Sequence, residues 1–305
     1  MAAFKTWIRA ARPRTVLLSF SGVLLGGFLA IAKAPEPVEG PTPWLCLFFC
    51  ALTAVLLQIL SNLANDYGDF KKGTDSAKRI GPQREMQSGA ITEKEMRLGI
   101  AVVSAMCLVS GALIFVFARL SWQELAVFAA LGIASVLAAL LYTLGKHPYG
   151  YHGLGDVFCF LFFGWVAVAG TYYLATKRVD AAILLPATAM GCLSVAVLNI
   201  NNMRDYENDK ANGKNTLVVK MGLNKAFIYH VFLIVLPFLC LTVFLLLKHA
   251  AWYAYAFWLM LPFFLMDLIT IRKKLATGVP DRMLPKQVVK SFLLIFLFVF
   301  LFLML

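Results

Sequence analysis

Nine long runs of apolar residues dominate this chain and leave little choice of fold. They occupy residues 16–32, 43–63, 98–117, 124–144, 155–175, 181–199, 226–247, 251–271 and 288–305. A hydrocarbon layer about 30 Å thick requires about 20 apolar residues in each spanning helix. The runs are continuous and far longer than the roughly 10-residue, alternating strands of a membrane barrel. We therefore predict an all-α, polytopic membrane protein with nine transmembrane helices.

Composition places the whole chain in the membrane class. Of its 305 residues 61% are hydrophobic and only 14% are charged, which is too apolar for an ordinary soluble domain. The first run is long enough to cross the bilayer, and no small-residue cleavage site is followed by soluble sequence, so it is not read as a cleavable signal. We expect residues 1–305 to form one transmembrane domain.

The basic residues indicate an orientation. If nine helices alternate across the bilayer, 23 of the 28 Lys and Arg residues fall on the N-terminal segment and every second loop after it. Cytoplasmic loops retain such residues, so we predict a cytoplasmic N-terminus in a bacterial inner membrane. The net charge of +12 then reflects sidedness, and no nucleic-acid partner is expected because exposed aromatics are not interleaved with the basic residues.

Two polar motifs follow the second and sixth runs. They read NDYGDFKKGTD (65–75) and LNINNMRDYENDKANGKNTL (198–217). An offset of 139 aligns Asp66 with Asp205, and a one-residue slip then aligns Asp69 with Asp209. The motifs lie four helices apart and so emerge on the same side. This spacing predicts two parallel four-helix pseudo-repeats, about 9–144 and 153–271, with an extra helix at 288–305.

The acids of these motifs suit a divalent cation. Asn201, Asp205 and Asp209 are spaced by four, so on one helix they would share a face, and Asn65 and Asp69 do the same. A carboxylate at a membrane boundary is costly to desolvate and usually has a partner or a function. Mg²⁺ prefers oxygen ligands and is often held by one or two carboxylates and a substrate phosphate. The predicted metal ligands are Asn65, Asp69, Asp75, Asp205 and Asp209.

Basic residues close to both motifs suit a diphosphate, which needs cationic donors as well as metal. The predicted diphosphate-binding residues are Asn65, Lys71, Arg79, Arg84, Arg204 and Lys214. Cations beside membrane spans are also expected from topology alone. The paired acids are not, and they carry the prediction.

A cation transporter is the alternative class, because transporters also combine internal repeats with paired Asn and Asp residues. Their ion sites usually lie near the bilayer midplane on broken helices. Here the acids lie at the ends of their spans and are followed by basic loops. The position of the motifs favours an enzyme that acts on a phosphorylated lipid.

With these motifs the sequence resembles the UbiA superfamily of intramembrane aromatic prenyltransferases. Its NxxxDxxxD-like and DxxxD-like motifs match Asn65, Asp69 and Asp75, with a longer second gap, and Asn201, Asp205 and Asp209. The resemblance is closest to the 1,4-dihydroxy-2-naphthoate polyprenyltransferases of menaquinone synthesis. It is carried by RAARPRT (9–15), RIGPQREMQSGAIT (79–92), YTLGKHPYGYHGLGDVFCFLFFG (142–164) and GKNTLVVKMG (213–222). The segment GKHPYG departs from the family's usual Gly-Pro-x-Pro type of loop.

The resemblance implies Mg²⁺-dependent transfer of a polyprenyl chain from polyprenyl diphosphate to 1,4-dihydroxy-2-naphthoate, with release of diphosphate and CO₂ and with the isoprenoid tail among the helices. Another aromatic acceptor, such as 4-hydroxybenzoate, is the alternative substrate. The implied catalytic acids are Asp66, Asp69, Asp205 and Asp209. For the acceptor side the candidates are Asp156 as a catalytic acid and Tyr142, Lys146, Asn201 and Asn202 as substrate-binding residues.

Overall fold

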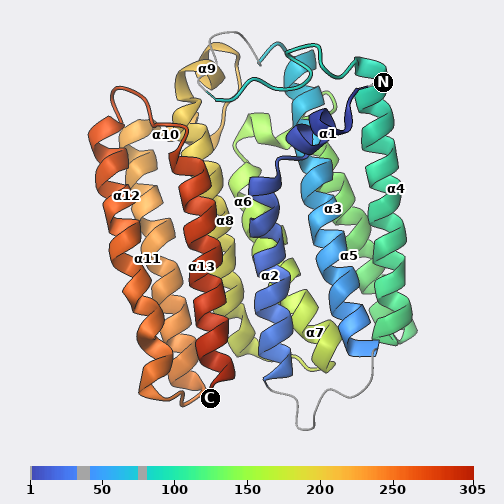
Figure 1. Ribbon diagram of the computed structural model, residues 1–305, viewed down its shortest axis with the longest axis vertical. Helices are drawn as coiled ribbons and strands as arrows, with labels where there is room; N and C mark the ends of the chain where they lie inside the picture. Colours follow the sequence, from blue (N-terminus) through green and yellow to red (C-terminus); the bar gives the residue numbers. More distant parts are fainter. Residues whose placement is uncertain (1, 33–41, 75–80) are drawn as a thin grey trace.

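The computed structural model describes residues 2–32, 42–74 and 81–305, which form a bundle of long helices (Figure 1). Within these residues nine segments are long and apolar enough to cross a membrane. They are Pro13–Ile31, Thr42–Lys71, Glu93–Ala118, Trp122–Leu141, Gly155–Thr176, Ala181–Arg204, Leu223–Leu247, Trp252–Lys274 and Met283–Leu303. Each overlaps one predicted run, and the described residues contain no strand. The predicted all-α membrane fold with nine spans is confirmed.

The first four spans are single α-helices preceded by a short helix that was not predicted. The elements are α1 (Phe4–Ala11), α2 (Pro13–Ile31), α3 (Thr42–Lys71), α4 (Glu93–Ala118) and α5 (Trp122–Leu141). Arg12 joins α1 to α2 with φ 51°, and Pro13, whose missing N–H is harmless at the first position of a helix, starts α2. Hydroxyl side chains of Thr92 and Ser121 cap the backbone N–H groups of Glu95 and Glu124, so the sequence itself sets where α4 and α5 begin.

The other spans contain more irregular helix. The elements are η1 (Tyr149–His152), α6 (Gly155–Cys159), a π-helical stretch η2 (Phe160–Gly170), α7 (Thr171–Thr176), η3 (Ala181–Ile183), α8 (Leu184–Arg204), α9 (Tyr206–Ala211), α10 (Leu217–Met221), α11 (Leu223–Leu247), η4 (Trp252–Met260), α12 (Leu261–Lys274) and α13 (Met283–Leu303). At two places η2 packs so closely against a neighbouring helix, α8 in one case and α2 in the other, that there is no space for a side chain. A Cβ on Gly164 would lie 2.6 Å from the Ala187 carbonyl oxygen, and one on Gly26 only 2.3 Å from that of Val168. Glycine therefore lets η2 pack directly on α8 and α2, as small residues do between membrane helices.

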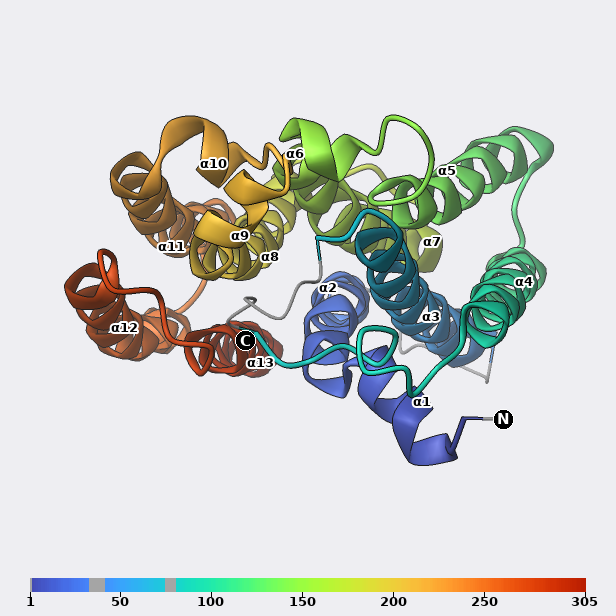
Figure 2. The same ribbon diagram turned by 90° about the horizontal axis from the view of Figure 1, so that it is seen from above.

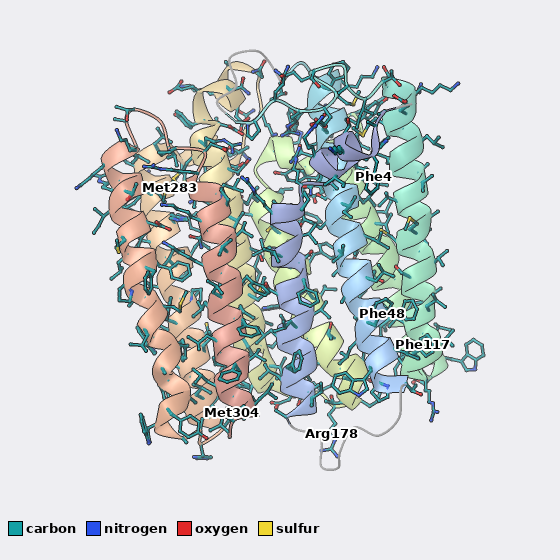
Figure 3. All side chains as sticks on the ribbon, viewed as in Figure 1. Phe4, Phe48, Phe117, Arg178, Met283 and Met304 are labelled. Carbon is teal, nitrogen blue, oxygen red and sulfur yellow. The ribbon has the colours of Figure 1, made fainter. Side chains whose placement is uncertain are left out.

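The bundle has an apolar interior and an apolar outer surface. In the interior, Phe238, Phe257, Phe264 and Phe298 are fully buried between α11, η4, α12 and α13. On the outside large apolar side chains are exposed, and Phe48 on α3, for example, is 57% exposed (Figure 3). A surface of this kind matches lipid rather than water.

The short elements gather at one end of the bundle. Helices α1, α9 and α10 lie at that end in Figure 1, and the view from above in Figure 2 shows the start of α6 at the same end beside α9. Phe4 and Met283 mark this end in Figure 3, whereas Arg178 and Met304 lie at the opposite end. Both acidic motifs end here, since α3 runs to Lys71 and α9 follows α8.

Candidate functional site

Asp69 is the centre of a buried network of hydrogen bonds and ion pairs. It lies in the last turn of α3 and is 1% exposed. Lys214 donates from Nζ to both carboxylate oxygens, at 3.0 and 3.2 Å. The Arg84 guanidinium lies 3.3 Å from the same carboxylate, and the Tyr151 hydroxyl donates to it at 2.8 Å. Since Lys214 and Arg84 are themselves buried, two cations and an anion are held together away from water.

These contacts join the two acidic motifs. Lys214 belongs to the second motif, and its partner Asp69 belongs to the first. A second link comes from Asn208 on α9, whose Nδ2 donates to the backbone oxygen of Thr74 at 2.9 Å. The ends of α3 and α9 therefore lie side by side, although Asp69 and Lys214 are separated by 145 residues in the sequence.

The second motif is not one continuous helix. Helix α8 ends at Arg204, Asp205 has φ −91° and ψ 9°, and α9 starts at Tyr206. The prediction that Asn201, Asp205 and Asp209 lie on one continuous helix is therefore wrong. The helical spacing of the three residues nevertheless continues across the break, because the backbone N–H of Asp205 donates to the Asn201 carbonyl at 3.0 Å and that of Asp209 to the Asp205 carbonyl at 2.8 Å. Asp205 accepts hydrogen bonds from its neighbour Arg204 at 2.7 and 2.8 Å. Adjacent side chains do not face each other on a regular helix, and the pairing occurs where the backbone of Asp205 departs from regular helical angles.

Arg204 is also tied to other parts of the chain. Its guanidinium donates to Asp281 at 2.7 Å and to Asn201 at 2.8 Å, and its side chain is 3% exposed. The predicted diphosphate-binding residue Arg204 and the predicted substrate-binding residue Asn201 thus hold the second motif in place. Asp209, the remaining acid of this motif, is 3% exposed on α9.

Both motifs end in the same backbone turn. The backbone N–H of Thr74 donates to the backbone carbonyl of Asp69 at 3.0 Å, and the backbone N–H of Lys214 donates to the backbone carbonyl of Asp209 at 2.9 Å. In each turn a glycine four residues after the acid has a left-handed conformation, Gly73 with φ 71° and Gly213 with φ 69°. This is the Schellman arrangement of a helix end. The shared turn supports the internal repeat, which stays a prediction.

Tyr151 and Thr74 belong to the site but were not singled out from the sequence. Because the Tyr151 hydroxyl donates to Asp69, it accepts from the Thr74 hydroxyl, 2.7 Å away. Burial, with a smaller contribution from Asp69, raises the pKa of Tyr151 well above its usual value, so the phenol keeps its proton. The sequence offered one indication of this role: Tyr151 lies in the loop GKHPYGYHG, which is predicted at the same end of the bundle as the two acidic motifs.

The acceptor-side candidates lie beside this network. Burial raises the pKa of Tyr142 well above its usual value, and the nearby carboxylates of Asp69, Asp156 and Asp209 add to the rise. Asp156 is 5% exposed, and its Oδ1 atom has no hydrogen-bond partner. The loop that contains Gly150 packs directly against the backbone of Tyr142. A Cβ on Gly150 would lie only 2.6 Å from the Tyr142 carbonyl oxygen, so this contact requires glycine.

The remaining candidates occupy different environments. Asn202 is buried on α8, whereas Lys146 is exposed on the loop after α5. Lys71 is exposed and pairs with Glu93 at 3.1 Å. Asp75 and Arg79 lie outside the described residues.

The loop that carries Arg84 is fixed by the N-terminal helix. Arg9 on α1 donates to both oxygens of Glu85 at 2.7 and 3.0 Å. In the same last turn of α1, the backbone oxygen of Ala11 accepts a hydrogen bond from Nδ2 of Asn62 on α3 at 2.9 Å. Helix α1 therefore connects the first motif with the residue that follows Arg84.

The donor set fits Mg²⁺ bound together with a phosphate rather than in a closed protein cage. No group of three His, Cys, Asp or Glu side chains in the described ranges lies close enough to hold a metal alone. The oxygens of Asp66, Asp69, Asp205 and Asp209 are nevertheless buried at one end of the bundle. The Oδ1 atom of Asn65 is buried without a hydrogen-bond partner, as suits a ligand oxygen. One or two carboxylates with substrate phosphates are the usual ligands of Mg²⁺.

Comparison with known proteins identifies the family. The sequence profile described as the UbiA prenyltransferase family matches residues 22–284. The chain belongs to the UbiA prenyltransferase family. It is 43% identical over 258 residues to the 1,4-dihydroxy-2-naphthoate octaprenyltransferase of Haemophilus influenzae, covering 85% of this chain and 82% of that protein. Identity to the Escherichia coli enzyme of the same name is also 43%, over 81% of this chain and 79% of that one.

Solved structures share the fold of this UbiA family member. A UbiA homolog from Archaeoglobus fulgidus bound to GPP and Mg²⁺ has a TM-score of 0.63 at 17% identity, with 98% of this chain and all of that chain covered. A structure described as digeranylgeranylglyceryl phosphate synthase has a TM-score of 0.58 at 16% identity, with 98% and 97% covered. The protein is a multi-pass membrane prenyltransferase of the UbiA family.

Proposed function

We propose that this protein transfers a polyprenyl chain from polyprenyl diphosphate to 1,4-dihydroxy-2-naphthoate. The observation that carries the proposal is the meeting of both acidic motifs around Asp69, Lys214 and Arg84 at one end of an apolar bundle. The names of the two relatives that are 43% identical to it over the aligned residues support the naphthoate acceptor and an octaprenyl donor. Family membership favours this enzyme over the cation transporter.

The diphosphate would bind where the two cations meet the acids. Lys214 and Arg84 are buried and held by one carboxylate, so both cations are fixed in position beside the acids, where phosphate oxygens would approach them. Charge-assisted hydrogen bonds of this kind are among the strongest in proteins. Mg²⁺ held by Asn65 and by Asp66, Asp69, Asp205 and Asp209 would neutralise negative charge on the leaving diphosphate.

The chemical step balances without an added oxidant or reductant. The bond between the allylic carbon and the diphosphate oxygen breaks, and its electron pair leaves with the diphosphate. The naphthoate carbon that carries the carboxylate forms the new carbon–carbon bond. The carboxylate then leaves as CO₂, and the electron pair of its bond to the ring restores aromaticity. The protein's share of this step is charge stabilisation and the exclusion of water.

The residues beside the Asp69 network would orient the aromatic acceptor. Asp156 presents an unpartnered buried oxygen, which would accept a hydrogen bond or a proton from an acceptor hydroxyl. Tyr142, whose phenol stays protonated because its pKa is raised by burial, would donate to an acceptor oxygen. Asn201 and Asn202 on α8 complete the proposed contacts, and Lys146, exposed on its loop, would act at the entrance.

The location of the reaction follows from the two substrates. The polyprenyl tail dissolves in lipid, and its diphosphate must lie at the boundary with water. We place the end of the bundle that carries the site on the cytoplasmic side of a bacterial inner membrane, because most of the basic residues border that end if the helices alternate.

An acceptor panel tests the proposal. The purified protein is supplied with labelled polyprenyl diphosphates of several lengths and, separately, with 1,4-dihydroxy-2-naphthoate, 4-hydroxybenzoate and homogentisate, and products are identified by mass. We expect prenylated, decarboxylated naphthoate, no product with EDTA, and recovery on addition of Mg²⁺. Lys225 is exposed and lies outside the site, so the variant Lys225→Gln is the matched control for activity lost during purification.

Two results would contradict parts of this assignment. Prenylation of 4-hydroxybenzoate without naphthoate product would refute the acceptor but keep the reaction class. Full activity after chelation of Mg²⁺ would refute the role given to the acids.

A further inference from the structure

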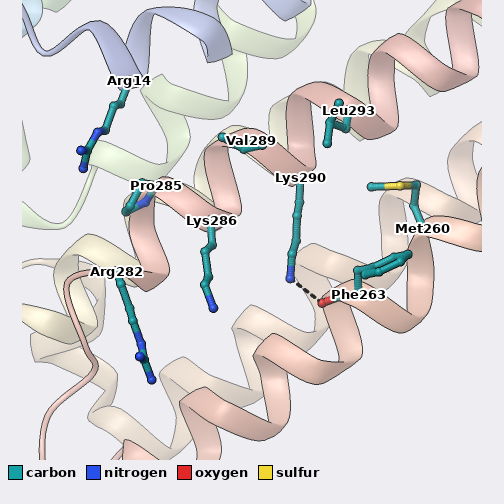
Figure 4. Close-up of a pocket in the computed structure, with 9 residues that line it drawn as sticks. All are labelled: Arg14, Met260, Phe263, Arg282, Pro285, Lys286, Val289, Lys290 and Leu293. Carbon is teal, nitrogen blue, oxygen red and sulfur yellow. Dashed lines mark hydrogen bonds between the residues drawn. The ribbon is translucent and has the colours of Figure 1, made fainter.

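A lipid-facing groove of about 630 Å³ lies beside α13, and none of the residues that line it belongs to the acidic motifs (Figure 4). One wall is formed by α13, the other by the end of η4 and the start of α12, and Arg14 at the start of α2 completes it. Met283 marks the start of α13 at the end of the bundle that carries the site (Figure 3). The groove therefore begins at a membrane boundary and runs into the apolar zone.

Three basic side chains border the groove at its boundary end, where their aliphatic stems form part of the apolar wall. Arg14, Arg282 and Lys286 line the groove and are exposed, and within the described parts of the chain no acid pairs with any of them. Lys290, one turn further, differs. Its ammonium donates to the Phe263 backbone oxygen at 2.7 Å (Figure 4), and it also forms an ion pair with Asp267. Three cations are thus left without a counter-charge, and the fourth is neutralised within the bundle.

The rest of the groove is apolar and open. Phe263 is 53% exposed, Val289 45% and Leu293 43%. Between Arg282 and Leu293 the helix rises about 16 Å at 1.5 Å per residue. That is close to half of a hydrocarbon layer about 30 Å thick. The charged and apolar parts together span one leaflet of a bilayer.

We propose that this groove binds an anionic phospholipid from the surrounding membrane. The headgroup phosphate, whose charge is not offset by a cation of the lipid itself, pairs with Arg14, Arg282 and Lys286, and an acyl chain lies along Phe263, Val289 and Leu293. Charge complementarity selects the occupant. A zwitterionic phospholipid carries its own cation, which offsets the phosphate charge and is repelled by the basic side chains. The inference concerns a second lipid site and does not depend on the proposed prenyl acceptor.

Lipid retention tests the site. The full-length protein in mild detergent is supplied with phosphatidylglycerol or with phosphatidylcholine of the same acyl chains, and bound lipid is counted by native mass spectrometry. We expect wild type to retain phosphatidylglycerol preferentially. Arg282→Gln with Lys286→Gln should weaken that binding roughly 30-fold, since each basic residue contributes measurably to attraction by anionic lipid. Phosphatidylcholine retention should not change.

The matched control removes two other exposed cations at helix ends. Lys225 and Lys274 are exposed and, among the described residues, have no acidic partner, so Lys225→Gln with Lys274→Gln lowers the net charge equally. This variant should retain phosphatidylglycerol like wild type. Equal loss in both variants would overturn the proposal, because it would show attraction by net charge alone. Unchanged binding in the groove variant would overturn it as well.

Two competitors separate the possible sources of phosphate. Inorganic phosphate should not displace the lipid, since it lacks the acyl chain; displacement would reduce the site to an anion site and overturn the proposal. A polyprenyl diphosphate should leave the lipid bound. Its one-for-one displacement of phosphatidylglycerol would make the groove a substrate path and refute the assignment to phospholipid.

Discussion

The two acidic motifs end in the same turn but keep their carboxylates in different ways. Asp69 stays in the helix and is held by residues from three distant segments, Arg84, Tyr151 and Lys214. Asp205, which the alignment pairs with Asp66 rather than with Asp69, lies at the break between α8 and α9. It accepts hydrogen bonds from the adjacent Arg204, which also donates to Asp281. Two helix ends with the same backbone turn can thus differ in how nearby carboxylates are neutralised, by distant residues in one motif and by a sequence neighbour in the other.

Asp69→Asn should have the largest effect. It leaves Lys214 and Arg84 buried beside a neutral amide, and unpairing a buried ion pair costs about 3–5 kcal/mol. Prenyl transfer should fall about 10²- to 10³-fold, as when a group that stabilises the transition state is removed. Turnover and thermal unfolding in detergent measure the two effects.

Asp180→Asn is the matched control for Asp69→Asn. Asp180 pairs with Lys248 at 2.7 Å at the other end of the bundle, so its loss should not alter prenyl transfer beyond the effect on stability. Activity close to wild type in Asp69→Asn would contradict the central place given to this carboxylate.

Asp205→Asn should destabilise the protein less than Asp69→Asn. Arg204 keeps its bonds to Asp281 and Asn201, so about 1.5–3 kcal/mol is expected for hydrogen bonds to a charged group. Adding Asp281→Asn leaves Arg204 without its second carboxylate and should cost more than the two single changes together. Unfolding midpoints test this, and an equal or larger loss from Asp205→Asn alone would reverse the comparison.

Gly73→Ala and Gly213→Ala should each cost about 1–2 kcal/mol, because both glycines have a left-handed backbone. No described atom lies within 4 Å of either added Cβ, so only the backbone contributes and the two losses should match. Asparagine, which tolerates this conformation better, should recover part of the stability. Clearly unequal losses would mean that the two turns are not equivalent.

Tyr151→Phe should have the smallest effect. It removes one hydroxyl, with its hydrogen bonds to Asp69 and Thr74, and keeps the ring. A loss of about 1 kcal/mol and a turnover reduced by a few-fold are expected. Thr74→Val, which removes only the second bond, should cost less, and if it were the more harmful change the hydroxyl of Tyr151 would not be the bridge described.

Hydropathy and motif spacing predicted much of this molecule. The nine apolar runs predicted the nine membrane-spanning segments. The prediction works because a chain in lipid must pair its backbone N–H and C=O groups internally, which a helix does. Asp69 and Lys214 were both chosen from the sequence, and the structure joins them. Their roles in metal and diphosphate binding remain predictions, as do those of Asp156 and Tyr142.

Three features escaped prediction for physical reasons. Helix α1 is only eight residues long, too short to cross a bilayer, although Phe4 and Ile8 are spaced by four as on an interfacial helix face. The break at Asp205 accompanies pairing of Arg204 with Asp281, 77 residues away, which no local pattern reports. Tyr151 contacts Asp69, 82 residues away in the sequence, from a loop that packs against Tyr142 at Gly150, and no local pattern reports such a long-range contact.

The link between Asp69 and Lys214 has a consequence for biosynthesis. The 145 residues between them take roughly 7 to 29 s to translate at about 5–20 residues per second. During that interval Asp69 has been made and its lysine has not, and Arg84 is the first of its two basic partners to be synthesised. The arginine thus serves as the early counter-ion of a nascent chain, and a ribosome that stalls before Lys214 leaves the carboxylate without its lysine partner.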